Sequence, residues 1–250
     1  MKFCTISDIH SHPPKPEYQD LLQRFLNHPE VKNCQKIFLL GDIFDVMVGH
    51  HLQYFKLYES FFQSLKQLAE TGIEIHYFEG NHDFHLKKLF KTFCHNHKLK
   101  NIFIHTHHLV AHIDGKKFYF SHGDDIEVGK FRYKSYKLFI KSLPLEFVAN
   151  YVVPFKLLDW MGNTASQNSK QQNHNRYNDA DFCEHTKNIF RFSATKAYKK
   201  QHFDFLFCGH AHISDLWNSP DGFTYVNGGP AFLTQQFSLY ENGRVQFIKL

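Results

Sequence analysis

The sequence has few cysteines, and their spacing excludes two classes of protein. The five cysteines are far apart and form no CxxC pair, so neither a disulfide framework nor a zinc ribbon is predicted. They are Cys4, Cys34, Cys94, Cys183 and Cys208. A reducing cytoplasm is the compartment that this cysteine usage favours.

The sequence also lacks a long uninterrupted apolar run. Its most apolar stretch, residues 145–161, contains Glu146, Pro154, Lys156 and Asp159, whereas a membrane-spanning helix needs roughly 20 mostly apolar residues. The first residues run directly into a β-like pattern, so we expect no export signal peptide.

The charge is mild overall but unevenly distributed. The formal net charge is +5, yet residues 130–200 hold 13 Lys and Arg against 5 Asp and Glu, which leaves 16 against 19 in the rest of the chain. A basic segment on a slightly acidic body predicts an anionic partner, such as a phosphate compound, a nucleic acid or a lipid surface. With 250 residues, 42% of them hydrophobic, we expect one domain over 1–250.

The hydrophobic pattern predicts an α/β fold. Residues 2–7, 36–40 and 73–78 are β-like runs separated by segments with helical spacing, a succession typical of a parallel sheet with right-handed crossovers. Further strands are predicted, and several are joined by Asp-Gly or Asn-Gly turns. The first three, at 102–105, 109–113 and 117–121, are expected to be closely connected, and the others lie at 204–208, 223–227, 235–240 and 245–249. We therefore expect two facing sheets with helices outside, and a helical insert, or lid, over 125–200.

Five short segments rich in Asp, Asn and His stand out. They are Asp8-Ile9-His10, Gly41-Asp42-Ile43-Phe44-Asp45, Gly80-Asn81-His82-Asp83, His122-Gly123-Asp124 and Gly209-His210-Ala211-His212. These side chains suit Mn, Zn, Fe or Mg. In open α/β sheets, ligands collect beyond the carboxyl ends of strands. Because the segments follow predicted strands, we expect them to converge on a site for two divalent ions, Mn being our first choice.

The residue types suggest a division of roles. Two neighbouring dications need a carboxylate between them, and Asp42 is the predicted bridge. One metal would take Asp8, His10 and His212, and the other Asn81, His122 and His210. Each metal keeps a position for water or a phosphate oxygen, which predicts phosphate hydrolysis.

Four neighbouring residues are predicted to assist. His82 is placed to hydrogen-bond the leaving oxygen or to donate a proton to it. Asp45, Asp83 and Asp124 are expected to orient the ligand histidines or the turn backbone.

Taken together and in this order, the five motifs resemble the calcineurin-like metallophosphoesterase family, whose pattern is DxH, GDxxD, GNHD or GNHE, a histidine before glycine, and GHxH. The match spans residues 8–212. The resemblance implies a four-layer α/β/β/α sandwich of two mixed sheets and the same metal roles.

A narrower resemblance is to bacterial UDP-2,3-diacylglucosamine pyrophosphatases of lipid A synthesis, through residues 41–44, 80–84 and 122–124. It implies cleavage of UDP-2,3-diacylglucosamine to UMP and 2,3-diacylglucosamine 1-phosphate (lipid X), a lid that grips acyl chains, and substrate contacts at Ser169 and Lys170. His82 stands where the best-known branch has arginine, and residues 130–176 match only loosely.

The insert itself combines apolar bulk with cations. Aromatic and aliphatic side chains are dense between 131 and 160, and Lys130, Arg132, Lys134, Lys137 and Lys141 lie among them. This composition suits an amphiphile with a phosphate head or an anionic membrane. Together with it, the resemblance to lipid A enzymes implies a cytoplasmic protein associated peripherally with the inner membrane. The insert could equally be a helical pair packed on the body.

Two other functions stay open at this point. One is a metallophosphoesterase for another phosphomonoester, phosphodiester or nucleotide. The other is a non-enzymatic binder of metal or nucleic acid. The complete set of expected ligands favours an enzyme over a binder, and we do not expect nucleic acid as a partner.

Overall fold

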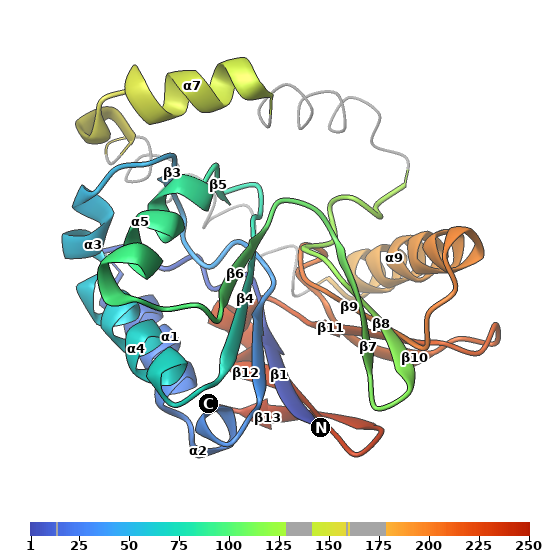
Figure 1. Cartoon of the computed structure of the whole chain (residues 1–250). Coiled ribbons are helices and arrows are strands. Elements are labelled where there is room, and N and C mark those ends of the chain that lie inside the picture. The colour runs from blue at the N-terminus through green and yellow to red at the C-terminus, as the bar shows by residue number, and fades with distance from the viewer. Residues whose placement is uncertain (14, 129–141, 159, 161–178) are drawn as a thin grey trace.

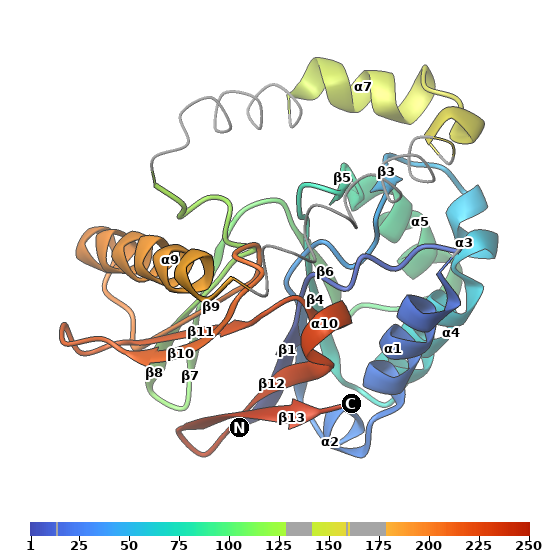
Figure 2. The same ribbon diagram turned by 180° about the vertical axis from the view of Figure 1, so that it is seen from behind.

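The computed structural model describes residues 1–13, 15–128, 142–158, 160 and 179–250. Two large sheets pack face to face, and helices cover the outer side of each (Figures 1 and 2). This four-layer α/β arrangement confirms the predicted fold class. Ser169 and Lys170, together with most of residues 129–178, lie outside the described residues.

The first sheet has six strands in the order β13-β12-β1-β2-β4-β6. Its strands are β1 (Lys2–Ile6), β2 (Lys36–Leu39), β4 (Glu74–Phe78), β6 (Ile102–His105), β12 (Gln236–Glu241) and β13 (Arg244–Lys249). The pairs β1–β2, β2–β4 and β4–β6 are parallel, whereas β12 and β13 add antiparallel pairs. Helices pack on the outer face. They are α1 (Pro16–Asn27), α2 (Pro29–Lys32), α3 (Gln53–Leu57), α4 (Glu59–Glu70) and α5 (Lys87–His97).

The second sheet has five strands in the order β10-β11-β9-β8-β7. Its strands are β7 (Leu109–Ile113), β8 (Lys116–Phe120), β9 (Phe205–Cys208), β10 (Ser214–Asn218) and β11 (Thr224–Gly228). The long helix α9 (Ala180–Lys200) lies across its outer face (Figure 1). The short helix α10 (Ala231–Thr234) leads from β11 to β12.

Two details differ from the sequence-based expectation. The predicted strand at 102–105 is β6 of the first sheet, parallel to β4, and does not join β7 and β8. Strand periodicity identifies a strand but not its partner. A two-stranded sheet of β3 (Met47–Val48) and β5 (Asp83–Phe84), together with β10, was not predicted.

Alternation along the strands assigns side chains to the layers. Phe3 lies between the two sheets, whereas its neighbour Cys4 faces the helices, as the two-residue period of a strand requires. Five aromatic rings lie with centroids 4.7–5.5 Å from that of Phe3. They are Phe38, Phe118, Phe120, Phe207 and Tyr240. These rings come from both sheets, so this core fixes one sheet against the other.

The described part of the insert is attached near β3 and β5. Helix α7 (Leu143–Tyr151) contributes Ala149 to a small buried cluster with Val48 and Leu158. His51 Nε2 lies 2.9 Å from the Ala149 carbonyl oxygen, and Figure 1 shows α7 above β3 and β5. Within the described ranges, no helix combines the length and apolar character needed to cross a bilayer.

Candidate metal centre

The predicted ligands follow the strands of both sheets. In the first sheet, Asp8 and His10 follow β1, Asp42 follows β2 and Asn81 follows β4. In the second sheet, His122 follows β8, and His210 and His212 follow β9. These strands run parallel within each sheet. Their carboxyl ends therefore meet at one edge of the sandwich, as the sequence predicts.

An unusual backbone conformation is concentrated at this edge. Among the described residues, ten that are not glycine have positive φ, and five of them are predicted ligands. These are Asp8, His10, Asp42, His210 and His212, with φ between 52° and 63°. Such conformations are unfavourable for residues with a Cβ, and they cluster at functional sites where the surroundings enforce them. Backbone hydrogen bonds from Asp8 to Gly41 (3.1 Å) and from His10 to Asp42 (3.0 Å) hold two of these turns.

The first group of donors consists of Asp8, His10, Asp42 and His212, whose ligand atoms all lie within 4.8 Å of one another. His212 Nε2 is 3.1 Å from Asp8 Oδ1. His10 Nδ1 is 3.2 Å from Asp45 Oδ1, while its buried Nε2 has no hydrogen-bond partner among the described atoms. A buried nitrogen without a partner is rare, and a cation in this group would supply one.

The second group is built around His122. Its Nε2 lies 3.1 Å from Asn81 Oδ1 and 3.5 Å from Asp42 Oδ2. Its Nδ1 lies 2.8 Å from the Leu40 carbonyl oxygen, and only a protonated Nδ1 can donate to that oxygen, which leaves Nε2 as the ligand atom. The His210 ring lies 5.0 Å from the His122 ring, between centroids. Asp42 thus faces both groups.

Two glycines allow the turns to approach closely. A Cβ on Gly80 would lie 2.1 Å from Asp42 Oδ1, and one on Gly41, whose φ is +84°, would lie 2.7 Å from His122 Nδ1. The backbone N–H groups of Asn81 and His82 each donate to Asp42 Oδ1 over 2.9 Å. The Asp42 carboxylate is therefore held by the backbone of a turn that only glycine can form without displacement.

Asp83 ties the same two turns together. Its fully buried carboxylate accepts the N–H groups of Asp42 (3.0 Å), Ile43 (2.7 Å) and Gly80 (2.8 Å). Burial and the charge of Asp42 raise the pKa of Asp83 to about 6. The predicted orienting role of Asp83 agrees with these contacts.

Asp45 holds His10 and a buried lysine. Its Oδ2 lies 3.2 Å from Lys15 Nζ, and its Oδ1 faces His10. Although burial opposes ionisation, His10 and Lys15 lower the pKa of Asp45 to about 2. An ionised Asp45 therefore sits behind a ligand histidine, as expected for a residue that orients it.

The field of the carboxylates is strong where the cation would lie. Burial disfavours a charged His122, yet Asp42 and, more weakly, Asp124 and Asp8 raise the pKa of His122 to about 10 in the metal-free protein. Burial likewise opposes ionisation of Asp42, but His122 and His82 hold its pKa well below the usual range. A cation replaces the proton of His122 in such a site.

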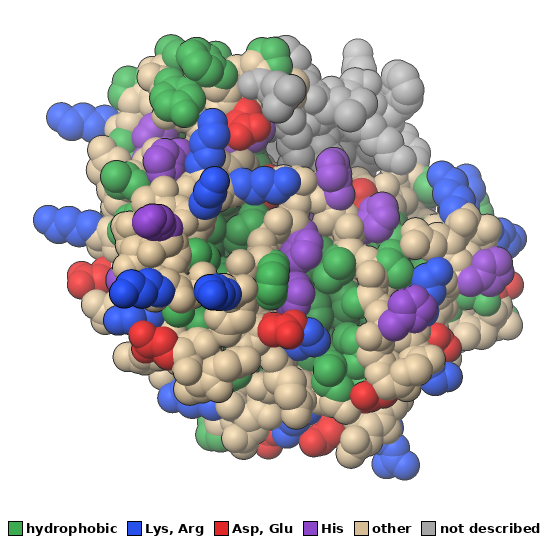
Figure 3. Space-filling model, viewed as in Figure 1, with side chains coloured by type: hydrophobic (Ala, Val, Ile, Leu, Met, Phe, Trp, Pro, Cys, Tyr) green, Lys and Arg blue, Asp and Glu red, His purple; other side chains and the backbone are tan. Residues whose placement is uncertain are grey.

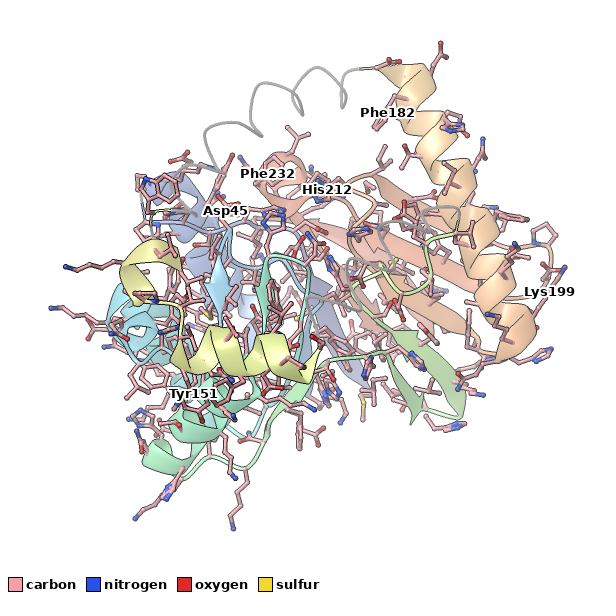
Figure 4. The ribbon with its side chains drawn as sticks, turned by 90° about the horizontal axis from the view of Figure 1, so that it is seen from above. Asp45, Tyr151, Phe182, Lys199, His212 and Phe232 are labelled. Carbon is pink, nitrogen blue, oxygen red and sulfur yellow. The ribbon has the colours of Figure 1, made fainter. Side chains whose placement is uncertain are left out.

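His82 lies beside the first group. Its Nδ1 is 2.9 Å from the Asp45 carbonyl oxygen, and its ring meets the His10 ring edge-on with centroids 4.8 Å apart. Burial lowers the pKa of His82, but the charge of Asp42 and the Asp45 carbonyl outweigh this and raise it. In Figure 4, Asp45, His212 and Phe232 are grouped at this edge.

Sequence patterns did not single out three residues around the centre. Glu127 Oε2 lies 3.3 Å from His210 Nε2. Lys15 pairs with Asp45, and the Phe232 ring lies 5.9 Å from that of His10, between centroids. Glu127 follows His122 closely in an acidic run, but that run alone does not indicate which acid turns inward.

The fold and the donor groups define a metal-dependent hydrolase of phosphate compounds, and comparison with known proteins agrees. The family model described as calcineurin-like phosphoesterase matches residues 1–214. The chain therefore belongs to the calcineurin-like phosphoesterase family and is a metal-dependent phosphoesterase.

Several relatives carry the name UDP-2,3-diacylglucosamine hydrolase, and two of them show the extent of the similarity. The protein of Histophilus somni is 24% identical over 226 residues, 88% of each chain. That of Aliivibrio fischeri is 27% identical over 157 residues, 62% of this chain and 61% of the other. A solved structure described as a novel archaeal phosphodiesterase covers all of both chains with a TM-score of 0.51 at 15% identity, and shares the fold.

Proposed function

We propose that the protein cleaves the pyrophosphate of UDP-2,3-diacylglucosamine, giving UMP and 2,3-diacylglucosamine 1-phosphate. The observation that carries the proposal is the attachment of an apolar helix, α7, to β3 and β5. Strand β3 begins two positions after Asp45, and β5 begins at Asp83, so both are continuous with motif segments. A phosphate-cleaving centre thereby lies beside a surface suited to acyl chains. The names of the relatives support the same substrate.

The proposed ligand division follows the two donor groups. Asp8, His10 and His212 would hold one ion, Asn81, His122 and His210 the other, and Asp42 both. Two divalent ions, when bound, supply Lewis acidity to phosphate oxygens and lower the pKa of water. The donor set of Asp, Asn and His fits Mn, and also Zn, Fe or Mg.

The protein's own residues prepare this centre before any ion binds. Asp45 and the Leu40 carbonyl occupy the Nδ1 atoms of His10 and His122, so both rings present Nε2. Backbone N–H groups fix the Asp42 carboxylate. Ligands held in this way lose little conformational freedom on binding.

His82 is the proposed proton donor to the leaving oxygen. The Asp45 carbonyl accepts its Nδ1–H and thereby orients the ring, and the raised pKa of His82 enlarges its protonated fraction near neutral pH. In this position a cationic imidazole also attracts the phosphate charge.

The insert, apart from α9, which packs on the second sheet, is the proposed lid of a single domain, with Ser169 and Lys170 as substrate contacts. The side chains of Phe147, Tyr151 and Trp160 are 60–62% exposed although they are large and apolar. Lys88 Nζ lies 5.1 Å above the Tyr151 ring. Figure 3 shows hydrophobic side chains gathered over α7. We propose that this face meets acyl chains and that the protein associates peripherally with an anionic inner membrane from the cytoplasmic side.

The test is product analysis with Mn-loaded protein. UDP-2,3-diacylglucosamine should yield UMP and lipid X, and the non-acylated UDP-N-acetylglucosamine should be a poor substrate. Tyr151→Ser should lower kcat/KM for the acylated substrate about tenfold or more, since one aromatic contact is lost. Leu216→Ser, at an exposed apolar position of β10, is the matched control. Rapid hydrolysis of soluble diesters without UMP release would instead support a phosphoesterase of other specificity.

A further inference from the structure

Glu127 is an acidic residue beside the metal centre that none of the five motifs includes. Its side chain is only 5% exposed, and its Oε2 lies 3.3 Å from His210 Nε2. It stands where the chain leaves the sandwich for the insert, five positions after His122. A buried carboxylate requires a hydrogen-bond donor or a cation nearby, and His210 is placed to supply the donor.

The backbone on both sides of Glu127 is fixed. Its own N–H donates to the Gly123 carbonyl over 3.3 Å, and the next N–H, that of Val128, donates to Ser193 Oγ on α9 over 3.2 Å. The preceding side chain, Ile126, is buried in a cluster with Phe190 of α9. The backbone that carries the Glu127 side chain is therefore held against α9.

His210 is held equally firmly. Its backbone N–H donates to the Asp8 carboxylate over 3.0 Å, and its φ is +63°. The centroid of its ring lies 5.0 Å from that of His122 and 6.2 Å from that of Phe190. Because Glu127 faces Nε2 over 3.3 Å, a cation held by His210 would meet Nδ1.

This arrangement reverses the one at two of the other three proposed ligand histidines. His10 and His122 turn Nδ1 towards the protein, to Asp45 and the Leu40 carbonyl oxygen, and keep Nε2 for the centre. His210 turns Nε2 towards the protein. An imidazole binds a metal through the nitrogen that carries no proton, so the hydrogen bond on the other nitrogen decides which atom that is.

We propose that Glu127 is a positioning residue of the metal centre. Its carboxylate accepts the Nε2–H of His210, fixes the tautomer with an unprotonated Nδ1, and makes that nitrogen a stronger donor to the ion shared with Asn81 and His122. The proposal rests on the proposed role of His210 as a ligand and does not depend on which phosphate compound is the substrate. It also links α9 to the centre, because Ile126 and Val128, on either side of Glu127, contact α9.

The experiment compares Glu127→Ala and Glu127→Gln with the wild-type chain, using Mn and Co as probes. Metal stoichiometry and affinity are measured by elemental analysis after dialysis and by competition with a chelator, and Co coordination by absorption spectroscopy. Asp125→Asn is the matched control, because this neighbouring acid pairs with the Tyr119 hydroxyl (2.9 Å) instead of a proposed ligand.

Glu127→Ala should weaken one of the two Mn sites by about 10- to 100-fold and change the Co spectrum. Glu127→Gln should recover most of that loss, because the amide oxygen still accepts Nε2–H. Asp125→Asn should bind both ions as the wild type does. Wild-type affinities in Glu127→Ala, or equal losses in both Glu127 variants, would overturn the proposal. A wild-type chain that binds fewer than two ions would instead refute the proposed metal centre.

If Glu127→Ala does not fold, the wild-type protein gives the answer. Histidine labelled with ¹⁵N shows which ring nitrogen carries the proton, and the His210 signals are identified by their loss in His210→Gln. The zinc-loaded protein should show Nε2–H and a metal-bound Nδ1 for His210. The opposite tautomer would overturn the role of Glu127.

Discussion

A single methyl group at Gly80 should disable the centre without removing any ligand. In Gly80→Ala the new Cβ would lie 2.1 Å from Asp42 Oδ1 and 2.5 Å from the Asp42 backbone nitrogen. An ordinary contact needs about 3.4 Å or more, so the carboxylate must move by about 1 Å. The same Oδ1 would lose the N–H bonds from Asn81 and His82.

The size of the effect follows from these contacts. Insertion of a methyl into a tightly packed site destabilises a protein by about 1–3 kcal/mol. A displacement of about 1 Å in a catalytic group lowers turnover by about 100-fold. Because Asp42 faces both donor groups, we expect both metal sites of Gly80→Ala to weaken together.

The assay combines Mn content, hydrolysis of a soluble phosphodiester, and thermal unfolding in EDTA. Gly228→Ala is the control, because its Cβ would meet only Ser238 Oγ at 3.5 Å, an ordinary contact. Folded Gly80→Ala with wild-type metal content and turnover within threefold of the wild type would refute the argument that Asp42 is fixed by this turn.

Three further outcomes are expected. His82→Ala should keep both metals and lower kcat, measured at saturating substrate, by about 100-fold or more. By the same measurement, His82→Arg should retain more activity than His82→Ala. Equal kcat values for wild type and His82→Ala would exclude the proton-donor role. The affinity for Mn should rise about tenfold per pH unit from pH 6.5 towards 10, because the pKa of His122 is about 10 without metal and binding displaces its proton. Calorimetry in two buffers should detect the released proton. An affinity that does not change with pH would contradict this displacement. Burial and the nearby His105 and Lys36 lower the pKa of His76 to about 4. Between pH 6.5 and 4, His76 is therefore protonated in the unfolded state but not in the folded state, and the free energy of unfolding should fall as the pH drops through that window, by on the order of 2 kcal/mol from this residue. Urea unfolding at pH 7 and 4.5 should show a smaller fall for His76→Phe than for the wild type.

Much of the fold was predictable because the spacing of apolar residues in the sequence follows the periods of strands and helices. Phe3 and Cys4 alternate between layers, and Asp114-Gly115 marks the β7–β8 hairpin with φ values of 50° and 74°. Strand partners are not encoded locally. The chain leaves β6 for the second sheet within a few residues, and β3 and β5 are two residues long, too short for a periodic pattern.

The site was predictable because the carboxyl ends of parallel strands lie at the same edge of a sheet. Asp8, Asp42 and Asn81 each follow a strand of the first sheet, so their convergence follows from topology. Glu127 was not predictable, because its contact with His210 depends on the packing of Ile126 against Phe190 of α9 and on the hydrogen bond from the Val128 N–H to Ser193. Contacts between residues 83 positions apart leave no spacing signal.

The central claim is that seven residues hold two neighbouring divalent ions, and anomalous diffraction from Mn-soaked crystals tests it most directly. We predict two peaks, one beside Asp8, His10 and His212 and one beside Asn81, His122 and His210, with the Asp42 carboxylate between them. A single peak, or peaks away from Asp42, would contradict the account.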